Sequence, residues 1–140
     1  MKRTQLAYRL ECLFDQKITS YYRNSFKGLL GQAQVSALNL LYEHESMGPV
    51  EMAELLNIPK QHTSKMLSRL AELGLACAAS DPADRRMHLY RLTEKGLQLV
   101  SDHISDSNRH FESLMSRLSP EDQKHFADAM KSMVFYLEKL

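Results

Sequence analysis

A single change of hydrophobic period constrains the fold of this 140-residue chain more than any other feature. Along most of the chain, apolar side chains recur at three- and four-residue spacing, which is typical of amphipathic helices. Between residues 75 and 92 the pattern changes to two short runs separated by turn-forming residues 80–84. This segment predicts one β-hairpin, with strands at about 75–79 and 87–92. We therefore expect one domain, mostly α-helical, with a small β-hairpin.

Capping and breaking residues divide the helical part into segments. Gly28 is expected to end the first helix, and Gly48-Pro49 breaks the second. Thr93 and Ser119 are side chains that cap helix N-termini, and each precedes a long apolar stripe. The predicted helices are 6–27, 32–45, 51–56, 59–73, 94–118 and a last helix from 120.

The order of these elements, two helices, a tight turn, a helix and a hairpin, is that of a winged helix-turn-helix. In such a fold the helix after the turn, here 59–73, enters the major groove of duplex DNA. Its polar side carries no acid before Glu72. Amide, hydroxyl and cationic side chains there can bond base edges or phosphates. The residues predicted to contact DNA are Lys60, Gln61, His62, Thr63, Ser64, Lys65, Ser68 and Arg69.

The distribution of charge along the chain supports DNA binding better than the net charge does. The net charge is only +1, but the segment 59–95 carries seven basic and four acidic residues and sums to +3. The tip of the predicted hairpin contributes Asp84, Arg85 and Arg86. Two adjacent arginines on a protruding loop can enter a minor groove, where the negative potential is concentrated. We expect all three residues to belong to the DNA-binding site.

Four sequence segments carry a resemblance to a known family. Residues 81–86 (DPADRR), followed by 92–96 (LTEKG), resemble the wing signature of MarR-type regulators. Upstream, 51–56 (EMAELL) and 69–75 (RLAELGL) resemble the bracing helix and the end of the recognition helix. The chain departs from the family in having Val50 where a capping Ser, Thr or Asn is usual, and in opening the recognition helix with PKQH.

The resemblance implies a homodimer that regulates transcription. It assigns about 1–30 and 97–140 to dimerisation helices, which flank a DNA-binding lobe at about 32–96. The last helix supports this assignment, because it carries more apolar residues than one neighbouring helix would cover. Two-fold symmetry predicts a palindromic operator. The resemblance also implies a repressor that a small molecule or an oxidant releases from DNA.

The residues leave the nature of that signal open. Cys12 lies where some relatives carry a redox-sensing cysteine, although a small buried hydrophobe is the alternative interpretation. A small aromatic or lipophilic effector would bind among Tyr21, Tyr22, Phe26 and Tyr42, which are also ordinary core residues. We expect no metal site, because the six histidines form no tight ligand cluster.

Other classes of protein are not indicated. No nucleophile with a base, paired carboxylates or phosphate-binding glycine loop has the required context, so we expect neither an enzyme nor a cofactor. No apolar stretch approaches the roughly 18 residues needed to span a bilayer. Two cysteines are too few for a disulfide framework. We therefore expect a cytoplasmic protein with no membrane partner.

Overall fold

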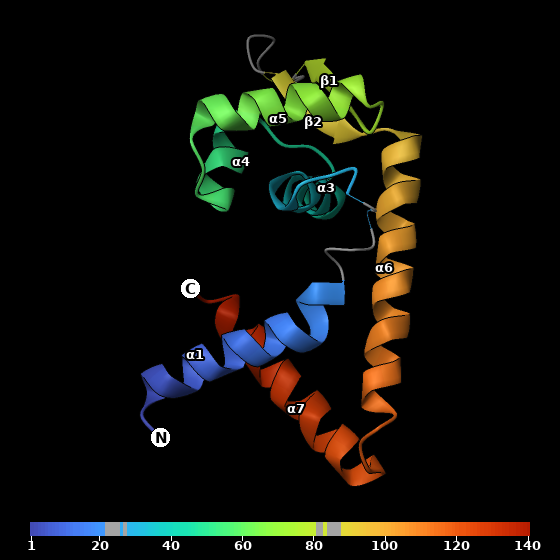
Figure 1. The fold of residues 1–140 in the computed structure, drawn as a ribbon. Coiled ribbons are helices and arrows are strands. Elements are labelled where there is room, and N and C mark those ends of the chain that lie inside the picture. Colours follow the sequence, from blue (N-terminus) through green and yellow to red (C-terminus); the bar gives the residue numbers. More distant parts are fainter. Residues whose placement is uncertain (22–25, 27, 81–82, 84–87) are drawn as a thin grey trace.

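The computed structural model describes residues 1–21, 26, 28–80, 83 and 88–140, and it confirms the predicted fold class. Figure 1 shows a lobe and an arm joined by the long helix α6 (Glu94–Met115). We define the lobe as residues 30–104, and the arm as residues 1–21 and 105–140. Among the described residues, no helix is long and apolar enough to cross a membrane.

Three helices build most of the lobe: α3 (Gln32–His44), α4 (Pro49–Leu56) and α5 (Lys60–Glu72). The predicted start of α4 was two residues late, because Gly48-Pro49 not only ends the preceding segment but also supplies the N-cap and the first helical residue. Pro59, expected inside α5, is its N-cap. Asn57 allows the sharp turn between α4 and α5 by adopting a left-handed conformation with φ of 53°.

The predicted hairpin is present and packs beside these helices. Strand β1 (Ala76–Ser80) pairs antiparallel with β2 (His88–Leu92), in a register that places Ala76 opposite Leu92. Met47, between α3 and α4, adds a short bridge to the outer edge of β2. Its amide nitrogen lies 3.0 Å from the carbonyl oxygen of Tyr90, and the reverse hydrogen bond is 2.9 Å long. The bridge ties the helical part of the lobe to the hairpin.

The buried core lies in the lobe. Leu38 of α3, Met52 of α4, and Leu67 and Leu70 of α5 are completely buried. Val100 of α6 is 1% exposed and joins the same cluster. The helix after the turn is therefore held by its apolar side, which leaves its polar side free.

The N-terminal region differs from the prediction of one uninterrupted helix. Helix α1 (Arg3–Phe14) continues into a π-helical segment, η1 (Asp15–Thr19), which carries one extra residue in its turn. Side chains satisfy two of the carbonyls there. The Ser20 hydroxyl donates to Gln16 O (2.8 Å), and Nε2 of His110 on α6 bonds Lys17 O (2.9 Å). The predicted end of the first helix falls partly on 22–25 and 27, outside the described residues.

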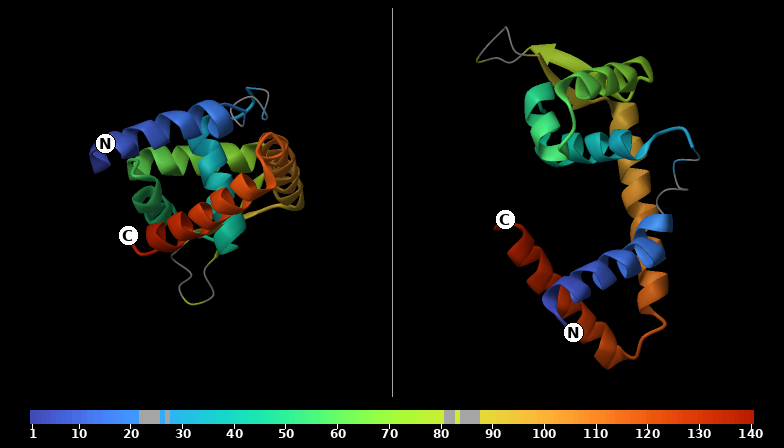
Figure 2. Two further views of the ribbon diagram at one scale, coloured as in Figure 1. Left: turned by 90° about the horizontal axis from the view of Figure 1, so that it is seen from below. Right: turned by 60° about the vertical axis from the view of Figure 1, so that its left-hand side comes forward.

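The helices of the arm bury less of their surface than the helices of the lobe do. Helix α7 (Pro120–Leu137) begins as predicted, with the Ser119 hydroxyl accepting a hydrogen bond from the Asp122 amide at 3.1 Å. Neither α1 nor α7 contains a buried residue. The two helices overlap in Figure 1, but the left view of Figure 2 shows them apart.

Candidate nucleic-acid interface

The polar side of α5 is the candidate interface. The structure leaves six of the predicted contact residues exposed and one half-buried along this side of the helix. The exposed residues are Lys60, Gln61, His62, Lys65, Ser68 and Arg69, and the half-buried residue is Ser64. In Figure 1, α5 lies at the end of the molecule farthest from α7, beside the hairpin. We call these seven residues the polar ridge of α5.

Thr63 is a correction to the predicted set. Its side chain is 0% exposed, and its hydroxyl lies 3.3 Å from the carbonyl oxygen of Pro59, to which it donates. It faces the same core as Leu67 and Leu70, because residues three and four apart share one side of a helix. Thr63 therefore helps to fix the first turn of α5 and does not belong to the exposed ridge.

The charges on the ridge are mostly uncompensated. Within the described part of the chain, neither Lys60 nor Lys65 forms an ion pair. Arg69 pairs with Glu72 at 3.1 Å, but both side chains are more than half exposed, so water screens the pair and it can be exchanged easily. Cations of this kind can neutralise phosphates of a nucleic-acid backbone.

The hairpin lies beside this ridge. Strand β1 packs against α5, and β2 begins at His88. The predicted wing residues Asp84, Arg85 and Arg86 lie outside the described residues, so only the strands that carry the wing are placed.

Known proteins share both the sequence pattern and this arrangement. Residues 30–96 match a family described as a winged helix DNA-binding domain. The transcriptional regulator HosA of Escherichia coli O111:H- is 25% identical over 94% of this chain and 96% of its own length. An uncharacterized HTH-type transcriptional regulator of Bacillus subtilis, YdgJ, is 22% identical over 74% of this chain, and the match spans 63% of that protein, less than two thirds.

Solved structures extend the likeness to the whole chain. RV1404 from Mycobacterium tuberculosis has a TM-score of 0.87 at 16% identity, covering 97% of this chain and 95% of that one. A mutant of MarR from E. coli has a TM-score of 0.76 at 18% identity, covering 96% and 97%. A mutant of MepR from S. aureus, bound to an oligodeoxyribonucleotide, has a TM-score of 0.66 at 22% identity, covering 98% and 99%.

Residues 30–96 therefore match a winged helix DNA-binding domain, and the fold of the chain is similar to those of MarR and MepR.

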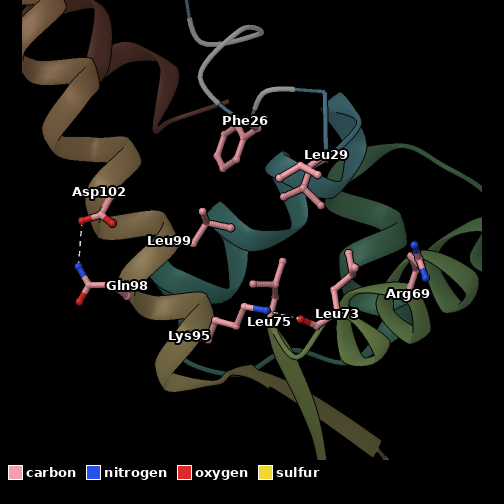
Figure 3. A pocket seen from close by; sticks show the side chains of 10 residues that line it. Phe26, Leu29, Arg69, Leu73, Leu75, Lys95, Gln98, Leu99 and Asp102 are labelled. Carbon is pink, nitrogen blue, oxygen red and sulfur yellow. Dashed lines mark hydrogen bonds between the residues drawn. The ribbon is translucent and has the colours of Figure 1, made fainter.

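The chain also contains a sizeable cavity, between α6 and the end of α5 (Figure 3). Its volume is about 750 Å³. Apolar side chains form most of the wall, and a few charged and amide groups stand at its edge. The lining residues are Phe26, Leu29, Leu30, Arg69, Leu73, Leu75, Lys95, Gln98, Leu99 and Asp102.

Of the four aromatic residues predicted for an effector pocket, the three that the structure describes do not gather in one place. Phe26 is buried and lines the 750 Å³ cavity. Tyr42 borders a separate cavity of about 340 Å³, and Tyr21 stacks on His110 with ring centroids 4.0 Å apart. Tyr22 lies outside the described residues. Of the predicted residues that the structure describes, Phe26 alone lines the larger cavity. The prediction did not include Lys95 and Leu99, which also line it and for which the sequence offers only their position at the start of α6.

Two further groups near α6 and α1 have altered acid–base properties. Burial lowers the pKa of His103, whose ring lies 4.5 Å from that of Phe26, and the charge of Asp106 offsets part of this effect. The pKa of Tyr8 is raised, chiefly by its hydrogen bond with Cys12. Cys12 is half-buried and not in a disulfide. Among the described residues, no cluster of side chains suited to a metal ion occurs.

Proposed function

We propose that this chain is a MarR-type transcriptional regulator, which binds a palindromic operator as a homodimer and represses transcription until a small lipophilic or aromatic molecule releases it. The observation that carries the proposal is the exposed ridge of α5, which is free of acids before Glu72 and stands on a winged helix lobe. Its amide and hydroxyl groups suit base edges, and Lys60 and Lys65 suit phosphates.

The arm supports the homodimer. Helix α7 exposes a row of large apolar side chains near its C-terminal end, and α1 exposes another. Exposed apolar surface of this extent is typical of an interface. The residues are Leu6, Leu10, Leu13 and Phe14 on α1, and Phe126, Met133, Val134, Phe135, Tyr136 and Leu137 on α7.

A two-fold dimer would present two copies of α5 to one side of the duplex. Each copy would enter a major groove, and the half-sites would lie one helical turn apart, roughly 34 Å. A palindromic operator follows from that symmetry. The MepR protein bound to an oligodeoxyribonucleotide is a relative in fold for which DNA binding is recorded.

The 750 Å³ cavity supports an effector site. It is bounded by α6, which belongs to both lobe and arm, and by the end of α5. A ligand that prefers one relative position of these helices would change the affinity for DNA. Cys12 offers oxidation as a second signal; replacing it with Ser would then abolish oxidant-dependent release from DNA.

DNA titration at two salt concentrations tests the proposal. The wild type, Arg86→Ala and Lys65→Met are each titrated onto the DNA upstream of the gene and onto random-sequence duplex. We expect the wild type to prefer the upstream DNA and to lose affinity as salt rises, because phosphate contacts release counterions. Each variant should bind more weakly. Failure of the wild type to bind any duplex would indicate that this winged helix serves a protein partner.

A further inference from the structure

Hydrogen bonds connect the C-terminal end of α5 to the first turn of α6. The helix ends in a Schellman motif in which Gly74, at φ +73°, allows the chain to reverse. The Leu75 amide bonds Leu70 O at 2.9 Å, and the Gly74 amide bonds Ala71 O at 2.9 Å. These bonds leave the carbonyls of residues 73, 74 and 75 directed away from the helix and without partners inside it.

Residues at the start of α6 satisfy all three of these carbonyls. Nζ of Lys95 donates to Leu73 O at 3.1 Å (Figure 3). The Thr93 hydroxyl donates to Gly74 O at 2.5 Å, and the Thr93 amide donates to Leu75 O at 3.1 Å. The same hydroxyl accepts from the Gly96 amide at 3.1 Å, so it both caps α6 and holds the end of α5. A cation at the C-terminal end of α5 also complements the helix dipole.

Gly96 permits the close approach that makes these bonds possible. A Cβ atom at this position would lie 2.0 Å from Leu75 O and 2.9 Å from Leu75 C. The neighbouring atoms are backbone, so a side chain at residue 96 would force the two helices apart.

We infer that Lys95 and Gly96 are positioning residues that set the angle at which α5 meets the duplex. The inference rests on the proposed DNA-binding function. Helix α6 leads from this junction into the arm, so in the proposed dimer the junction would also set the separation of the two α5 helices. A substitution that weakens this junction should reduce the preference for one half-site spacing more than it reduces the affinity for DNA in general.

Lys95 has an alternative role that must be separated from this one. It is an exposed cation in the lobe, and a direct contact with a DNA phosphate would also make it important. A phosphate contact contributes to every duplex equally and adds about one to the salt slope. A positioning residue contributes to the correctly spaced operator alone and leaves the slope unchanged.

The experiment compares Lys95→Met, Lys95→Arg and Lys65→Met with the wild type. The probes are a palindromic duplex selected from a random library, versions with one base pair added or removed between half-sites, and a random duplex. Affinities are measured over a range of salt concentrations. Lys65, on the exposed ridge, serves as the matched lysine for which a phosphate contact is expected.

We expect Lys95→Met to weaken binding to the selected palindrome about tenfold, in line with loss of a charge-assisted hydrogen bond. Binding to random duplex and the salt slope should stay at their wild-type values, and the discrimination between spacings should shrink. Lys95→Arg should restore it, since it keeps a cationic donor. Lys65→Met should weaken binding to all duplexes and lower the slope by about two, because the proposed dimer loses one phosphate contact in each subunit.

Two results would overturn the inference. One is a Lys95→Met protein whose affinity falls equally on all duplexes with a lower salt slope, which would make Lys95 a phosphate contact. The other is a Lys95→Met protein with unchanged affinity and spacing preference. Absence of DNA binding by the wild type would instead overturn the proposed function, and this inference with it. Gly96→Ala, checked for folding by circular dichroism, should show the larger effect of the same kind.

Discussion

The lobe and the arm of this protein bury their apolar residues to very different extents. In the lobe, Leu38, Leu67 and Leu70 are completely buried. In the arm, α1 and α7 contain no buried residue, and Phe135 and Leu137 of α7 are more than half exposed. A single chain therefore completes the core of the lobe, whereas the arm has apolar surface that a second copy would cover under the proposed function.

Helix α6 belongs to both regions and shows how they are connected. Val100 packs in the lobe core, and further along the helix His110 contacts the π-helical segment of the arm. The helix is amphipathic and continuous, so one element runs from the end of α5 into the arm.

The largest expected effect comes from removing a buried side chain of the lobe. Leu67→Ala should lower the free energy of unfolding by about 2–5 kcal/mol, because it leaves a cavity in a closed core. Chemical denaturation at several protein concentrations measures this. The decrease in the free energy of unfolding should be the same at each protein concentration. Leu137→Ala, in the arm, should instead mainly change how the free energy of unfolding depends on protein concentration, because it removes apolar surface from the proposed dimer interface. The same concentration dependence of unfolding in both variants would contradict the difference between lobe and arm.

A charge in the arm should act on association and not on the lobe. Phe135→Asp places a carboxylate in the proposed interface and should weaken the dimer about 100-fold, an effect typical of interface hot spots. Sedimentation at a series of concentrations measures the dimer dissociation constant, and circular dichroism monitors the lobe. Lys124→Gln, at an exposed position of the same helix, also lowers the charge by one and is the matched control. A wild-type protein that is monomeric throughout would contradict the proposed interface.

The smallest effect concerns pH. Burial lowers the pKa of His103 in the folded protein below its ordinary value of 6.5. As pH falls from 6.5 toward the lowered pKa, the unfolded chain binds the proton first, so stability present above pH 6.5 is progressively lost. His103→Phe should therefore make the unfolding free energy less dependent on pH between about 7 and 5. His125→Gln, exposed on α7, should follow the wild type; a His103→Phe protein that also followed it would show that burial of this ring has no such consequence.

Much of the architecture could be read from local signals. The caps Thr93 and Ser119, the break at Gly48-Pro49 and the change of period near residue 75 each act within a few residues of the chain. Local sequence therefore specifies where helices and strands begin, and the predicted winged helix and the polar side of α5 follow from those positions. Thr63 was assigned to the DNA-contacting set for its hydroxyl group, although its spacing from Leu67 and Leu70 places it on the apolar side of the helix.

Tertiary structure decided the features that depend on distant parts of the chain. The π-helical turn is accompanied by a contact between Lys17 and His110, which lie 93 residues apart. The junction between α5 and α6 joins Leu73 to Lys95, 22 residues away, and depends on the absence of a Cβ atom at Gly96. Periodicity and capping describe one element at a time, whereas hydrogen bonds and steric limits between elements exist only once those elements have packed together.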